Sequence, residues 1–85
     1  MPSVTIYTTR FCPYCTAAKE LLGKKDIRFD EVDVTGDPAG RRAMSDRAGG
    51  RTTVPQIFIG ERHVGGCDDL YDLDGAGQLD SLLAA

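Results

Sequence analysis

The chain has 85 residues, of which 41% are hydrophobic and 27% are charged, a composition typical of a single small globular domain over residues 1–85. Its formal net charge is −3, so we expect neither a nucleic-acid partner nor an anionic membrane surface, because both favour a positively charged protein. No apolar run approaches the roughly 20 residues of a membrane span, and the N-terminus does not resemble a leader, so we predict a cytoplasmic protein.

The first half of the chain alternates between strand-like and helix-like patterns. Residues 4–8 are rich in β-branched and aromatic side chains, which predicts a buried strand. Residues 13–22 place their apolar side chains on one helical stripe, and Pro13 suits a first helical turn. We expect a second strand over residues 27–34, with a bulge near its middle, and a second helix over residues 39–48.

The second half reads as a hairpin followed by a helix. Strands are expected over residues 56–59 and 63–64, joined by a tight turn. Helical spacing returns over residues 68–83, with interruptions expected at Gly75 and Gly77. The order β-α-β-α-β-β-α predicts an α/β fold, because the first β-α-β unit must be parallel and the hairpin adds antiparallel strands. We therefore expect a four-stranded mixed sheet with helices on both faces.

Cys12 and Cys15 lie two residues apart, where the first strand gives way to the first helix. A helix N-terminus presents free N–H groups and partial positive charge, which favour a thiolate, the nucleophile of disulfide exchange. The chain has three cysteines, whereas a disulfide-stapled secreted domain would carry a larger, even number. The pair predicts redox chemistry with Cys12 as the attacking sulfur. Half of a zinc site is the alternative, which only His63 and Cys67 could complete.

Three motifs carry a resemblance that covers essentially the whole chain: Cys12-Pro13-Tyr14-Cys15, Thr53-Val54-Pro55 and Gly65-Gly66-Cys67-Asp68-Asp69. Through them the chain resembles the small dithiol glutaredoxins of bacteria. The resemblance implies a thioredoxin fold and a glutathione-dependent reduction of protein–glutathione mixed disulfides and of protein disulfides, such as that of ribonucleotide reductase. It also implies a monomer that uses glutathione as co-substrate, with no tightly bound cofactor and no metal.

The resemblance assigns the chemistry to the first motif. Cys12 would attack the mixed disulfide and hold glutathione, and Cys15 would be the resolving thiol. Tyr14 would flank the bound peptide with its ring.

The other two motifs would bind glutathione. By resemblance, Thr53 and Val54, followed by a cis Pro55, would meet the cysteinyl part through backbone contacts. The N–H groups of Cys67 and Asp68 would take the γ-glutamyl carboxylate, and the Asp68 side chain would pair with the neighbouring amino group. This arrangement suits a zwitterion, because an acid beside an anion site would otherwise be repulsive. The plainer alternatives are a strand entry for the first segment and a helix N-cap role for Asp68 or Asp69.

One position departs from the family pattern. Many relatives carry a lysine where this chain has Thr9, with Arg10 next to it. Arg10 and Arg41 are therefore our candidates for binding the glycyl carboxylate of glutathione, and Arg51 is a further candidate at the mouth of the site. His63 is expected on an edge strand, facing solvent.

Two other functions stay open. One is a related protein reduced by thioredoxin reductase; the absence of tryptophan and the presence of the third motif favour glutathione instead. The other is a [2Fe–2S] carrier in which Cys12 of two subunits and two glutathiones hold the cluster. The presence of Pro13 and Cys15 argues against that carrier, because relatives that carry a cluster mostly lack one of them.

Overall fold

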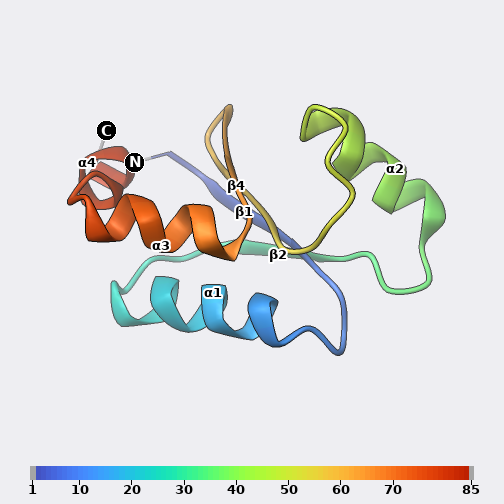
Figure 1. Cartoon of the computed structure of the whole chain (residues 1–85), viewed down its shortest axis with the longest axis horizontal. Helices are drawn as coiled ribbons and strands as arrows, with labels where there is room; N and C mark the ends of the chain where they lie inside the picture. Colours follow the sequence, from blue (N-terminus) through green and yellow to red (C-terminus); the bar gives the residue numbers. More distant parts are fainter. Residues whose placement is uncertain (1, 85) are drawn as a thin grey trace.

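The computed structural model describes residues 2–84. Along the chain it forms β1 (Val4–Thr8), α1 (Pro13–Lys24), β2 (Asp30–Asp33), α2 (Pro38–Arg47), β3 (Gln56–Ile59), β4 (Arg62–Gly65), α3 (Cys67–Gly75) and α4 (Leu79–Ala84). The four strands lie in the order β2-β1-β3-β4. The β1–β2 pair is parallel, and the β1–β3 and β3–β4 pairs are antiparallel. The predicted mixed sheet flanked by helices is confirmed (Figure 1).

The second strand is shorter than predicted. It covers Asp30–Asp33, not residues 27–34, and its pairing with β1 runs from Thr5 opposite Asp30 to Thr8 opposite Asp33. All four residues of this edge strand are exposed. The bulge that we expected near the middle of β2 lies elsewhere. The β1–β2 register is continuous, and the irregularity falls between β3 and β4, at Ile57 and Phe58.

The last predicted helix is two helices. The chain leaves α3 through Gly77, whose φ of +72° is left-handed, a conformation that favours glycine at the end of a helix. Gly77 N–H donates to Asp74 O at 3.0 Å and Gln78 N–H donates to Leu73 O at 2.9 Å, the paired bonds of a Schellman motif. The interruption expected at Gly77 is confirmed, whereas Gly75 is the last residue of α3.

One face of the sheet carries the main apolar core. Alternating residues of β1 and β3 point to this face, where α1 and α3 lie side by side (Figure 1). This burial supplies the main driving force for folding. The cluster consists of Val4, Ile6, Ala18, Leu21, Leu22, Ile57, Ile59, Cys67, Leu70, Leu79 and Leu83.

The opposite face is smaller and more polar. The intervening strand residues Tyr7 and Phe58 meet there edge to face, with ring centroids 5.7 Å apart. Arg47 of α2 lies over the Phe58 ring at 4.1 Å from its centroid, a favourable cation–π geometry. Met44 of the same helix is fully buried. Helix α2 therefore covers this side through one buried apolar residue and a stacked guanidinium.

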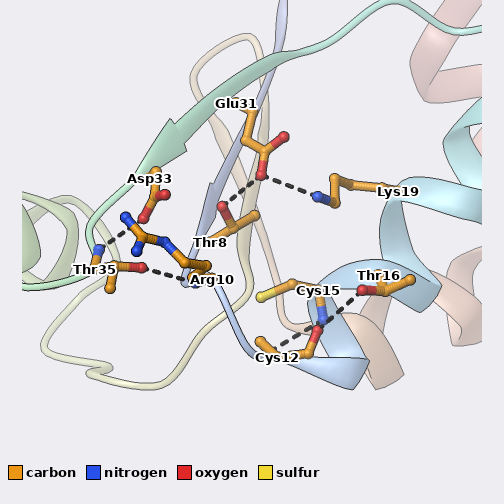
Figure 2. Close-up of polar contacts among 9 residues, drawn as sticks. All are labelled: Thr8, Arg10, Cys12, Cys15, Thr16, Lys19, Glu31, Asp33 and Thr35. Carbon is orange, nitrogen blue, oxygen red and sulfur yellow. Dashed lines mark hydrogen bonds and ion pairs between the residues drawn. The ribbon is translucent and has the colours of Figure 1, made fainter.

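A polar contact ties β1, β2 and α1 together beside the first cysteine motif. The buried Thr8 hydroxyl donates to Glu31 at 2.7 Å, and Lys19 of α1 pairs with the same carboxylate at 3.0 Å (Figure 2). These two hydrogen bonds lower the pKa of Glu31, that of Thr8 most. Within residues 2–84, none of the helices is long and apolar enough to cross a membrane.

Candidate active site

Cys12 lies at the amino end of α1. It is the N-cap residue, with extended backbone angles of φ −131° and ψ 103°, and Pro13 begins the helix. The Cys15 N–H donates to the Cys12 sulfur at 3.2 Å, and the Thr16 hydroxyl donates to the Cys12 carbonyl at 3.3 Å (Figure 2). The Thr16 N–H donates to the same carbonyl at 3.1 Å. The sulfur thus replaces the oxygen of an ordinary N-cap, and negative charge on it is stabilised by the helix terminus.

The two cysteines of the motif differ sharply in exposure. Both are free thiols; Cys12 is half-buried, whereas Cys15 has only 1% of its surface exposed. Burial raises the pKa of Cys15 to about 12, helped by its hydrogen bond with Cys12. Cys15 is therefore a thiol at neutral pH, and Cys12 is the sulfur that a second molecule can reach.

A groove of about 160 Å³ lies beside Cys12. The Cys12 sulfur is 3.8 Å from the Val54 carbonyl oxygen, which belongs to one wall of the groove. The Val54–Pro55 peptide bond is cis, as predicted. The structure thus brings all three motifs together, and the residues that line the groove are Tyr14, Arg51, Thr53, Val54, Pro55, Gly66, Cys67, Asp68 and Asp69.

The second wall is the amino end of α3. Gly66 is the N-cap residue, so neither aspartate of the motif has that role. The N–H groups of Cys67 and Asp68 belong to the first helical turn, where no intrahelical partner exists. An anion can therefore dock at this end of the groove, next to the exposed Asp68 carboxylate. The Cys67 thiol is buried, which raises its pKa.

Asp69 fastens the turn that precedes this wall. Its carboxylate accepts the Gly66 N–H at 2.8 Å and pairs with Arg51 at 3.2 Å. The Gly66 hydrogen bond, with that of Arg51, lowers the pKa of Asp69. Gly65 has a φ of +117°, and a Cβ there would meet the Asp69 carboxylate and come within 2.6 Å of the Arg51 guanidinium. The turn therefore needs glycine at this position.

The arginines expected near the ligand lie in different places. Arg51 lines the groove. The Arg10 guanidinium lies beside Asp33, on the side of the molecule where the Arg10 N–H donates to the Thr35 hydroxyl at 2.7 Å (Figure 2). Arg41 donates to the Thr52 carbonyl at 3.0 Å. Neither Arg10 nor Arg41 is among the residues that line the groove.

The expectation that His63 faces solvent is wrong. His63 is half-buried on β4, stacks on Phe58 and lies 2.7 Å from the side-chain oxygen of Gln56. Gln56 itself, fully buried, was not singled out from the sequence. A signal was present, because Gln56 is a polar residue next to the apolar run Ile57–Ile59, and buried polar groups need partners.

A larger hollow of about 750 Å³ lies away from this chemistry. It is lined by Pro2, Ser3, Val4, Asp26, Ile27, Arg28, Phe29, Asp30 and Leu83. It contains no cysteine, so the smaller groove beside Cys12 is the candidate active site. Among residues 2–84, no group of three or more histidine, cysteine or acidic side chains is arranged to hold a metal ion.

Comparison with known proteins places the chain in a family. The glutaredoxin family model matches residues 4–64. A glutaredoxin of Pseudomonas aeruginosa is 56% identical over 85 residues, covering 100% of both chains. Glutaredoxin 3 of Escherichia coli (strain K12) is 55% identical over 83 residues, covering 98% of this chain and 99% of its own.

Solved structures agree with this assignment. The solution structure of glutaredoxin from Brucella melitensis has a TM-score of 0.85 and 55% identity, covering 98% of this chain and 89% of that one. A crystal structure of a buckwheat glutaredoxin–glutathione complex has a TM-score of 0.86 and 25% identity, covering 98% and 77%. With its thioredoxin fold and its cysteine pair at the start of α1, the chain belongs to the glutaredoxin family of thiol–disulfide oxidoreductases.

Proposed function

We propose that the protein uses glutathione to reduce protein–glutathione mixed disulfides and protein disulfides, with Cys12 as nucleophile and Cys15 as resolving thiol. The observation that carries the proposal is the groove beside the Cys12 sulfur, one wall of which ends 3.8 Å from that sulfur. Backbone groups of Val54 suit a peptide strand. Free helix N–H groups next to the Asp68 carboxylate suit the zwitterionic γ-glutamyl end of glutathione. A buckwheat relative has been solved in complex with glutathione.

The first step is an exchange at sulfur. The Cys12 thiolate attacks the glutathione sulfur of the mixed disulfide, a new S–S bond forms between Cys12 and glutathione, and the protein sulfur leaves as a thiolate that takes a proton from water. A second glutathione thiolate then attacks the bound glutathione sulfur, which releases glutathione disulfide and restores Cys12. The net reaction consumes one free glutathione: the protein sulfur is reduced to a thiol, and the glutathione that was attached to it leaves together with the incoming glutathione as glutathione disulfide.

Protein disulfides need the buried thiol. In that route Cys12 attacks the substrate disulfide and forms a mixed disulfide with one of its sulfurs. Cys15 then attacks the Cys12 sulfur, which releases the reduced protein and leaves a Cys12–Cys15 disulfide, and two glutathione molecules reduce that disulfide. Burial and the Cys12 hydrogen bond together raise the pKa of Cys15 to about 12. The charge of Cys12 also raises the pKa of Cys15. Once Cys12 is in a disulfide it carries no negative charge, so this contribution no longer opposes the deprotonation of Cys15. Ribonucleotide reductase is the substrate class that the family resemblance suggests.

Two cysteine variants test this division of roles. Cys12→Ser should abolish turnover of both substrate types in an assay coupled to glutathione reductase. Cys15→Ser should keep most of the turnover of a glutathione mixed disulfide and lose most of that of a protein disulfide. Equal losses in the two assays would contradict the assigned roles. Faster turnover with thioredoxin reductase, or iron–sulfur absorbance after anaerobic reconstitution, would favour one of the two alternative functions.

A further inference from the structure

A chain of hydrogen bonds, centred on one buried side chain, links the edge strand β4 to the groove. Gln56 is fully buried at the start of β3. Its side-chain nitrogen donates to the Thr53 carbonyl at 2.9 Å and lies 3.3 Å from the Thr53 hydroxyl. Its side-chain oxygen lies 2.7 Å from His63 Nε2. Both ends of the amide are therefore paired, as the cost of burying an unpaired polar group requires.

The direction of these bonds follows from their chemistry. A carbonyl can only accept, so the amide nitrogen of Gln56 faces Thr53 and its oxygen faces His63. His63 must then carry a hydrogen on Nε2, which is so in one neutral tautomer and in the imidazolium. The His63 ring stacks on Phe58, with centroids 4.9 Å apart and planes at 29°. The His63 end of this chain of hydrogen bonds is therefore packed against the buried Phe58 ring.

The other end of the chain, where Gln56 hydrogen-bonds Thr53, acts on the wall of the groove. The Thr53 C=O and the Val54 N–H belong to one planar peptide unit and, when it is trans, point in opposite directions. The Gln56 amide holds the Thr53 carbonyl toward β3, so it also turns the Val54 N–H away from β3. The same Val54 lines the groove, and its carbonyl oxygen is 3.8 Å from the Cys12 sulfur.

We infer that Gln56 and His63 are positioning residues that hold the Thr53–Val54 peptide unit in the orientation that binds the cysteinyl part of glutathione. The inference rests on the proposed glutathione-dependent function. Neither side chain lines the groove, so both act through Thr53. Their contribution should therefore affect substrate binding more than the chemical step.

Gln56→Glu tests the hydrogen bond between Gln56 and the Thr53 carbonyl. A carboxylate can still accept from His63, but it cannot donate to the Thr53 carbonyl. In the glutathione-coupled assay with a peptide–glutathione mixed disulfide, we expect KM to rise about tenfold, equivalent to roughly 1.4 kcal/mol, with kcat changed by less than about twofold. Arg62→Gln, at an exposed position of β4, is the matched control and should leave both constants near the wild-type values.

His63 variants test the hydrogen bond between His63 and Gln56. They also keep the inference testable if Gln56→Glu does not fold. His63→Phe keeps a ring for stacking but loses the donor, so KM should rise about threefold, equivalent to roughly 0.7 kcal/mol. His63→Gln restores an N–H donor and should recover most of that loss. A folded Gln56→Glu, or His63→Phe, with wild-type KM would overturn the inference, as would failure of His63→Gln to recover the loss.

A direct binding measurement separates this inference from the proposed function. Titration of ¹⁵N-labelled protein with S-methylglutathione, which cannot react, should shift the Val54 amide resonance in the wild type and require about tenfold more ligand in Gln56→Glu. No binding by the wild type would remove the proposed function itself. Equal binding by the wild type and Gln56→Glu would remove only the positioning role.

Discussion

The wall of the groove that contains Thr53–Pro55 is held by a buried, uncharged amide, whereas the wall that begins at Gly66 is held by an exposed ion pair. Gln56 has 0% of its surface exposed; the side chains of Arg51 and Asp69 are 47% and 43% exposed. Salt and pH act strongly on exposed charges and weakly on a buried neutral group. The two walls should therefore respond differently to the same change in solution conditions.

The largest expected effect comes from Gly65→Ala, which breaks the exposed wall. The new Cβ would meet the Asp69 carboxylate and the Arg51 guanidinium, at a residue whose φ of +117° favours glycine. We expect the free energy of unfolding, measured by urea denaturation, to fall by about 2–3 kcal/mol, with weaker glutathione binding. Gly23→Ala is the control, because a Cβ there meets no atom within 4 Å; it should stabilise helix α1 by about 0.5–1 kcal/mol. Equal stability of the two variants would contradict this reading of the turn.

Asp69→Ala should show a smaller effect that depends on pH. The folded-state pKa of Asp69 lies below its unfolded value because of the Gly66 and Arg51 hydrogen bonds. The carboxylate therefore adds stability above the unfolded pKa, near 3.9, and that stability is lost as the pH falls through the folded pKa. At pH 7 the free energy of unfolding of the variant should be about 1 kcal/mol lower than that of the wild type. This value is reduced because the Asp69 side chain is partly exposed.

Urea denaturation at several pH values measures this difference. The gap between wild type and Asp69→Ala should be constant above pH ~5 and close as the pH falls below ~4. Asp69→Asn, which keeps an acceptor for the Gly66 N–H, should lose less than Asp69→Ala. A stability difference between wild type and Asp69→Ala that widens in acid would contradict a folded-state pKa of Asp69 below its unfolded value.

Arg51→Gln should have the smallest effect and the clearest salt dependence. Exposed ion pairs contribute about 0.2–1 kcal/mol, and about 1 M salt shortens the Debye length to roughly 3 Å. The stability lost in Arg51→Gln should therefore shrink toward zero as sodium chloride is added. The loss of glutathione affinity in Gln56→Glu should change much less over the same range. A loss in Arg51→Gln that does not change with salt would remove the contrast between the walls.

Local signals in the sequence were sufficient for most of the fold. Strand β1 was predicted with its observed bounds, and helix α1 begins at Pro13, within the cysteine motif, as expected. The β2 strand was overextended because the apolar residues Ile27 and Phe29, which pack against the core without joining the strand, gave the segment a strand-like pattern. The strand begins only where pairing with β1 begins, at Asp30 opposite Thr5.

The candidate site divides in the same way. Its motif residues were predicted, and Tyr14, the second motif and the third motif without Gly65 line one groove. The partners that hold the groove were harder to foresee: the hydrogen bond of Gln56 to His63 joins two strands, and the ion pair of Arg51 with Asp69 joins a loop to a helix. Arg10 lies beside Asp33, because side-chain direction depends on the path of the backbone.

The amino-acid sequence by itself determined the local features of the candidate site: a cysteine at the start of a helix, a proline after Val54 and glycines before a second helix, since these features depend on neighbours a few residues away. Only the tertiary structure decided that Cys12 and Val54 meet, that Cys15 is buried, and that the buried Gln56 side chain hydrogen-bonds the Thr53 carbonyl. Those outcomes depend on contacts between residues far apart in the chain, which form only when the sheet and its helices pack together.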